Sequence, residues 1–187
     1  LGFKVKNLDG YCGYIEFGEG EELLGIIGHL DVVPEGEGWT FPPFSATIHD
    51  NKIFGRGAID DKGPVISSLY AMKAVMENCH VQKRVRLILG LNEEKNWNCI
   101  KHYKKVEESP TLSFSPDADF PCIYAEKSIL NCYINMPYSN PEYVPITIKE
   151  VNCNNNALNV VPKSCTIVLK INDKNKKKKK IITTSQE

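Results

Sequence analysis

The 187-residue sequence has no run of about eighteen apolar residues, which excludes a transmembrane helix of ordinary length. Residues 1–6 do not have the pattern of a signal peptide, and no initiator methionine is present, so we expect the chain to begin inside a longer protein. The glycine-rich stretches contain no Gly-x-x-x-x-Gly-Lys-Ser/Thr motif, which excludes a Walker A phosphate-binding loop.

Paired cysteine motifs are also lacking. The seven cysteines stand singly, their number is odd, and no Cys-x-x-Cys occurs. This pattern argues against a structural zinc cluster and against a disulfide framework. Cysteines used as small apolar residues are typical of a reducing compartment, so we expect a cytoplasmic protein.

The sequence has no overall excess of charge, with 23 basic and 23 acidic residues, but the two signs are unevenly distributed. Residues 1–172 are mildly acidic, and residues 173–187 contain a lysine run. An acidic body argues against nucleic acid as the main partner. The run could hold nucleic acid or anionic lipid by counterion release, but a solvated, disordered tail is the simpler interpretation, and we expect neither partner.

Residues 1–135 show the alternation of an α/β domain. Apolar strands are predicted at residues 11–17, 23–33, 51–54, 85–91 and 111–114, and helical spacing at residues 65–76 and 97–106. Strands alternating with helices predict a mainly parallel sheet with helices on its faces.

The pattern changes near residue 135. Residues 128–137, 144–151 and 165–171 alternate like strands with one solvent-exposed face. We therefore predict a first domain over residues 1–135, a second, partial domain over residues 136–172, and a basic disordered tail over residues 173–187.

His29 and Asp31 follow the apolar run at residues 23–27, where a buried strand delivers polar groups. Residues i and i+2 of a strand point to the same face, so Asp31 could fix the tautomer of a metal-binding His29. A lone histidine at a strand end is more often a hydrogen-bonded structural residue, so partners are needed.

Acidic residues follow three other predicted elements of the same domain: Asp60 with Asp61, Glu93 with Glu94, and Asp117 with Asp119. The ends of parallel strands meet at one edge, so these carboxylates are expected to converge on His29. One histidine with several carboxylates is a ligand set for Zn²⁺ or Mn²⁺. The alternative is that each acidic pair occupies a separate solvated turn or helix cap.

Four motifs resemble the metal-site motifs of the M20 metallopeptidases, most closely the PepV-like (Sapep-type) dipeptidases. They are Gly28-His29-Leu30-Asp31-Val32-Val33-Pro34, Gly55-Arg56-Gly57-Ala58-Ile59-Asp60-Asp61-Lys62-Gly63-Pro64, Asn92-Glu93-Glu94 and Phe114-Ser115-Pro116-Asp117-Ala118-Asp119-Phe120-Pro121. The resemblance implies a zinc-aminopeptidase-like catalytic domain with two divalent metal ions, Zn²⁺ before Mn²⁺. It also implies an inserted α+β lid domain, of which Asn159-Val160-Val161-Pro162 would be part.

The resemblance assigns four metal ligands. His29 and Asp117 would bind one ion, Asp60 would bridge the two ions, and Glu94 would bind the second, with Asp119 an alternative to Asp117. The expected reaction is hydrolysis of the peptide bond of unblocked dipeptides.

Two further residues receive catalytic roles from the same resemblance. Asp31 would orient His29, and Glu93 would be the general base that moves a proton from the attacking water to the leaving amine. The resemblance also implies a dipeptide substrate, and it leaves open whether the chain forms a homodimer.

The resemblance is incomplete. The family's second ion also takes a histidine from a later part of the catalytic domain, and no counterpart of that motif occurs here, so the chain looks truncated at its C-terminus. The alternative function is therefore a catalytically inactive remnant that binds one metal weakly.

Overall fold

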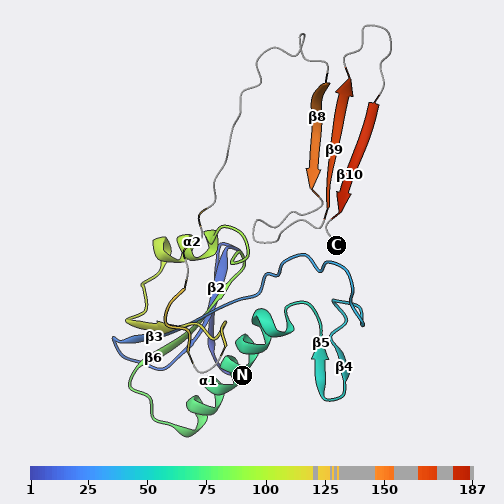
Figure 1. The fold of residues 1–187 in the computed structure, drawn as a ribbon. Helices are drawn as coiled ribbons and strands as arrows, with labels where there is room; N and C mark the ends of the chain where they lie inside the picture. The colour runs from blue at the N-terminus through green and yellow to red at the C-terminus, as the bar shows by residue number, and fades with distance from the viewer. Residues whose placement is uncertain are drawn as a thin grey trace. The chain divides into compact units, whose positions relative to one another are not determined.

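The computed structural model describes two compact units, Leu1–Glu126 and Lys127–Glu187 (Figure 1). The residues described are 1–119, 122–126, 128, 130, 146–153, 164–171 and 179–185. Within these ranges, no helix is both long enough and apolar enough to cross a membrane. The predicted boundary near residue 135 and most of the predicted strand at 128–137 lie outside the described residues.

The first unit is built on a five-stranded sheet with the order β1-β2-β6-β3-β7. These strands are β1 (Lys4–Leu8), β2 (Cys12–Phe17), β6 (Arg84–Gly90), β3 (Leu23–His29) and β7 (Leu112–Phe114). β3 pairs in parallel with both β6 and β7, whereas β2 pairs antiparallel with β1 and with β6. The α/β class is confirmed, and the three predicted strands around His29 form the parallel part of the sheet.

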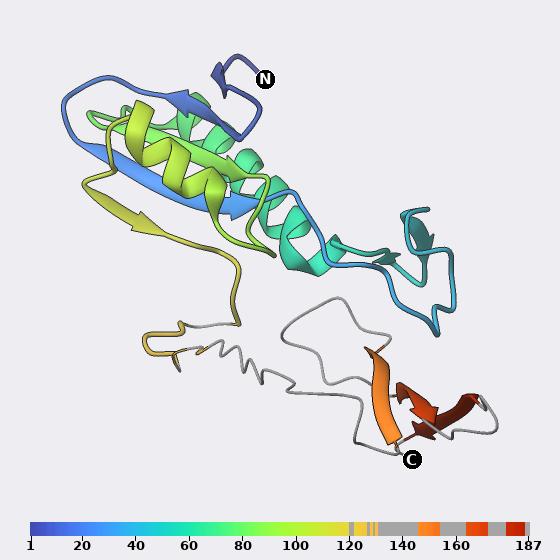
Figure 2. The same cartoon turned by 90° about the horizontal axis from the view of Figure 1, so that it is seen from above.

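Two helices cover opposite faces of this sheet (Figure 2). The first, α1 (Gly63–Asn78), packs Val65 and Met72 into a core cluster that includes Leu87. The second, α2 (Asn98–Val106), packs Cys99 and Tyr103 against a cluster that includes Ile88. The adjacent β6 residues Leu87 and Ile88 therefore pack on opposite faces of the sheet, because successive side chains of a strand point to opposite faces.

A buried arginine ties α2 to the antiparallel half of the sheet. Arg86 donates hydrogen bonds to Glu16 at 2.5 Å and to the Tyr103 hydroxyl at 2.7 Å. Its guanidinium also lies 3.9 Å from the ring centroid of Tyr14. Burial disfavours the charge of Arg86, but the hydrogen bonds that it donates to Glu16 and Tyr103 outweigh this effect and keep its pKa above the usual range.

Two strands of the first unit were not predicted. β1 has only Leu8 buried, so its charged, alternating residues give no apolar signal. β4 (Thr47–His49) lies where no strand was predicted, and it pairs with β5 (Lys52–Phe54), which matches the strand predicted at residues 51–54. The connecting Asp50 and Asn51 both have positive φ, as the two central residues of a type I′ hairpin turn do.

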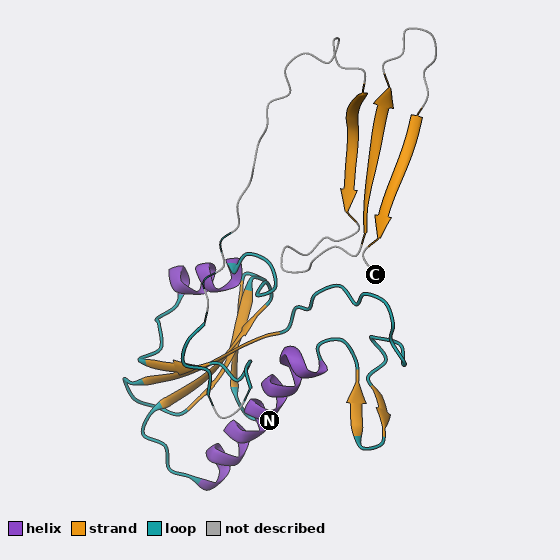
Figure 3. Cartoon of the chain, in the orientation of Figure 1, coloured by secondary structure: helices purple, strands orange, loops and turns teal. Residues whose placement is uncertain are grey.

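The second unit contains an antiparallel sheet of order β10-β9-β8 (Figure 3). β8 (Ile146–Cys153) and β9 (Ser164–Ile171) match two predicted strands. β10 (Lys179–Ser185) differs from the prediction of a disordered tail over 173–187. The β-branched run at 181–184 favours a strand, whereas the prediction of disorder was based on the missing core-forming periodicity and the lysine run.

Replacing Leu87 by alanine tests the core beneath the sheet. Leu87 is fully buried in the cluster that joins α1 to β6, so Leu87→Ala is expected to lower the free energy of unfolding by about 2–5 kcal/mol. Leu112→Ala is the matched control, since Leu112 is 71% exposed, and its effect should stay within about 0.5 kcal/mol. Urea unfolding of both variants measures the difference, and equal losses would contradict this packing.

Candidate metal centre

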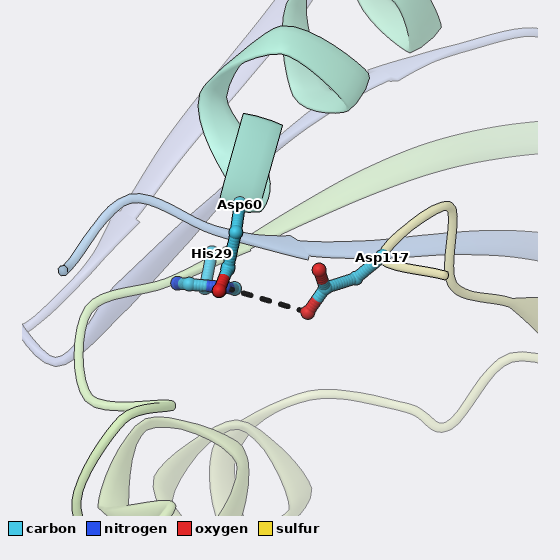
Figure 4. Close-up of side chains that lie close together, drawn as sticks. All are labelled: His29, Asp60 and Asp117. Atoms are coloured by element: carbon cyan, nitrogen blue, oxygen red, sulfur yellow. Dashed lines mark hydrogen bonds and ion pairs between the residues drawn. The ribbon is translucent and has the colours of Figure 1, made fainter. Parts of the chain in front are cut away.

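His29 ends β3 and is only 2% exposed. Its Nε2 atom lies 2.8 Å from Asp60 Oδ1 and 3.5 Å from Asp117 Oδ2 (Figure 4). Asp60 precedes α1 and Asp117 follows β7, so three distant segments meet at one imidazole. Parallel pairing of β3 with β7 brings the last of these segments to the carboxyl edge of the sheet.

The second nitrogen of His29 is held by the main chain. Nδ1 lies 2.9 Å from the carbonyl oxygen of Asp31 and 3.5 Å from its carboxylate Oδ1. A proton on Nδ1 satisfies this carbonyl and leaves the lone pair of Nε2 directed at Asp60 and Asp117. Asp31 thus makes its shortest contact with His29 through the backbone, not through the carboxylate expected from the sequence.

The Asp31 carboxylate instead holds the turn that carries the two glutamates. Its Oδ1 accepts the backbone N–H of Glu93 at 3.1 Å, and its Oδ2 accepts that of Glu94 at 3.2 Å. A carboxylate that accepts two amide groups makes strong, charge-assisted hydrogen bonds. Spacing in the sequence gave no sign of this contact, because it joins residues far apart in the chain.

All six predicted site residues, His29, Asp31, Asp60, Glu93, Glu94 and Asp117, lie at this edge of the sheet; we call them the His29 cluster. The potential ligand atoms form two groups, His29 with Asp60 and Asp117, and His29 with Glu93 and Glu94. Within each group these atoms all lie within 4.8 Å of one another. Asp119, the alternative ligand, belongs to neither group. The convergence does not fit a set of separate solvated turns.

Asp61 holds the backbone of His29 from the buried side of the cluster, a role that the sequence did not reveal. Its side chain is fully buried, and its Oδ2 accepts the backbone N–H of His29 at 3.1 Å. Gly28 permits this approach, because a Cβ there would lie 2.7 Å from Asp61 Oδ2 and 2.6 Å from Val65 Cγ2. Asp60 and Asp61 are joined by a cis peptide bond, and only Asp60 presents its carboxylate to the His29 ring.

Lys62 completes the support on this side. Its ammonium group donates a hydrogen bond to the carbonyl of Leu30 at 2.7 Å, which ties the start of α1 to the chain leaving β3. Gly57, at φ 80°, opens the turn η1 (Ala58–Lys62) that carries both aspartates. Only glycine adopts this backbone conformation without strain.

The crowded carboxylates disfavour their own ionisation. Burial, and then the negative charge of Asp60, raises the pKa of Glu94 and of Asp117. Burial also raises the pKa of Glu93, and it raises that of Asp61 to about 6 although the His29 N–H opposes it. For His29, burial lowers the pKa, but the hydrogen bonds to Asp60 and the Asp31 carbonyl outweigh it and raise the pKa overall.

A divalent cation is the chemical complement of such a cluster. Its charge offsets the repulsion among the carboxylates and the cost of partly burying Glu93 and Glu94. The donors are one imidazole nitrogen and several carboxylate oxygens, a set that suits Zn²⁺ or Mn²⁺. The residues present therefore fit the metal that the sequence motifs imply.

A cavity of about 160 Å³ adjoins the cluster. His29, Glu93 and Asp117 form its polar wall, and apolar groups of β3 and of the segment around α2 form the rest: Ile27, Trp97, Cys99 and Ile100. The cavity is thus apolar on one side and lined by the candidate metal ligands on the other.

The chain belongs to Peptidase family M20/M25/M40, which it matches over residues 25–176. It is 47% identical over 169 residues to a Bacillus subtilis (strain 168) protein named "Putative dipeptidase YtjP", covering 90% of this chain and 36% of that protein. A Staphylococcus aureus (strain USA300) protein, "Putative dipeptidase SAUSA300_1697", is 43% identical over 155 residues, which cover 79% of this chain and 33% of that protein. These matches confirm the resemblance to the M20 metallopeptidases, and both relatives are named as putative dipeptidases.

A solved M20 family metallo-carboxypeptidase, Sso-CP2 from Sulfolobus solfataricus, is 33% identical, with a TM-score of 0.39 over 42% of this chain and 19% of that one. The chain spans about a third of the length of the curated relatives that it matches.

Replacing Asp31 by asparagine tests the hold on the glutamate turn. Asp31→Asn keeps one acceptor oxygen but places an amide donor against the other backbone N–H, so the metal-free protein should lose about 1.5–3 kcal/mol of stability. Asp50→Asn, on the exposed β4–β5 hairpin, is the control and should change stability by less than about 0.5 kcal/mol. Urea unfolding in the presence of a chelator makes the comparison, and matching midpoints would refute this role for Asp31.

Proposed function

We propose that the His29 cluster is the metal-binding part of a dipeptidase site that hydrolyses unblocked dipeptides with two divalent ions, Zn²⁺ before Mn²⁺. The observation that carries the proposal is the pair of ligand groups that converge on His29. His29 and Asp117 would hold one ion, Glu94 would hold the second, and Asp60 would be shared by both. The dipeptide substrate follows the names of the relatives, which describe dipeptidases.

Divalent ions held by these residues would supply Lewis-acid chemistry, which polarises the scissile carbonyl and lowers the pKa of the attacking water. Glu93 accepts the proton of the attacking water at its carboxylate and passes it to the nitrogen of the leaving amino acid. Burial favours this role, because it raises the pKa of Glu93 toward the range in which a carboxylate both takes and returns a proton.

The chain's other residues serve to orient these groups. The carbonyl of Asp31 fixes the His29 ring, and its carboxylate sets the backbone of Glu93 and Glu94. The adjoining cavity offers an apolar surface next to Glu93, where part of a bound dipeptide would exclude water. We further propose a cytoplasmic location, with no nucleic-acid or membrane partner and a homodimer left open.

Metal binding is tested by replacing the shared imidazole. Titration calorimetry with Zn²⁺ and with Mn²⁺ should show that His29→Ala lowers affinity by at least about 100-fold, more than the loss of a supporting residue does. His49→Ala is the matched control, since His49 is an exposed residue of the β4–β5 hairpin and should bind like the parent chain. Equal affinities in the two variants would place the metal elsewhere.

The stoichiometry of the same titration separates the two functional alternatives. The proposed site takes two ions per chain, whereas an inactive remnant would take fewer than two, and weakly. A value of two therefore supports the dinuclear assignment, and a single weak site supports the remnant.

Hydrolysis is tested on a panel of unblocked dipeptides with the metal-loaded chain. Glu93→Gln removes the proton acceptor and should slow turnover by about 10²–10⁴-fold while leaving metal binding intact. Glu77→Gln is the control, because Glu77 pairs with Lys73 on the exposed side of α1 and should retain full activity. An intact, metal-loaded parent chain without activity would remove the proposed reaction for this chain, and a fully active Glu93→Gln would remove the assigned base.

A further inference from the structure

Two cysteines of the second unit face each other across the β8–β9 ladder. Cys153 is the last residue of β8, Cys165 is the second residue of β9, and the register pairs them directly. Their sulfur atoms lie 3.1 Å apart, and both side chains are half-buried. Both are free thiols in the structure.

This position meets the geometric requirement for a disulfide. Residues directly opposite in antiparallel strands have Cα atoms about 4.5–5.5 Å apart. Disulfide-linked cysteines have Cα separations of about 4.4–6.8 Å, so the bond needs no large backbone movement. The neighbouring pairs Asn152–Thr166 and Val151–Ile167 hold the register on one side of the two thiols.

We propose that Cys153 and Cys165 are a reversible dithiol–disulfide site that exchanges with small-molecule disulfides such as oxidised glutathione. One thiolate attacks a sulfur of the reagent, which forms a mixed disulfide and releases one glutathione thiol. The other thiolate then attacks the protein sulfur of that mixed disulfide and releases the second glutathione. The protein's two thiols are oxidised, the reagent is reduced, and the two thiol protons end on the two glutathione molecules.

The bond would join the two ends of the segment between β8 and β9. That segment, residues 154–163, contains Asn159-Val160-Val161-Pro162, the motif that resembles part of the family's lid domain. The site lies in the second unit and uses none of the His29 cluster, so it stands independently of the proposed dipeptidase reaction.

Peptide mapping of the parent chain tests the proposal directly. After incubation with oxidised glutathione and alkylation of the remaining thiols, trypsin cuts after Lys149, Lys163 and Lys170, which separates the two cysteines into different peptides. We expect mass spectrometry to find peptides 150–163 and 164–170 joined by a disulfide, and dithiothreitol to separate them. Finding both cysteines alkylated, or each carrying its own glutathione, would overturn the proposal.

Single substitutions add a signature that a mere structural role would not give. In Cys165→Ser no second thiol resolves the mixed disulfide, so Cys153 should accumulate a stable glutathione adduct. Cys79→Ser is the matched control, since Cys79 is exposed at the end of α1, and it should form the joined peptides as the parent chain does. Loss of the joined peptides in Cys79→Ser would assign the exchange to another pair and contradict the inference.

Discussion

The convergence of several carboxylates on one buried imidazole is the constraint around which the first unit is arranged. Like charges placed this close repel each other, and the partial burial of Glu93 and Glu94 weakens the screening of their charges by water. The fold must therefore hold the acids in place by other contacts until a cation offsets their charge. Those contacts come from the backbone at the ends of β3 and β6 and at the start of α1.

The segments next to the His29 cluster each contribute one of these contacts. β3 places His29 at the sheet edge, and the Asp31 carboxylate holds the turn after β6. Asp61 binds the main chain of His29 from beneath, at a point where only glycine at position 28 leaves room. These contacts preorganise the candidate ligands of the His29 cluster for a divalent metal.

The sequence predicted which candidate ligands would meet at the sheet edge, but not the contacts by which they support one another. His29, Glu93 and Asp117 stand at predictable ends of parallel strands, because an apolar run stops at each of them. Nothing in the spacing distinguished the role of Asp60 from that of Asp61, because the backbone of η1 decides which carboxylate reaches the imidazole. The use of the Asp31 carboxylate was equally hidden, since its partners are backbone amides.

The central claim is that the cluster around His29 binds divalent metal, and a crystal structure of the chain grown with Mn²⁺ tests it most directly. Anomalous diffraction should show a peak within coordination distance of His29 Nε2 and of the Asp60 and Asp117 carboxylates. A fully occupied Mn²⁺ elsewhere, or carboxylates that turn away from His29 with no peak between them, would contradict the account.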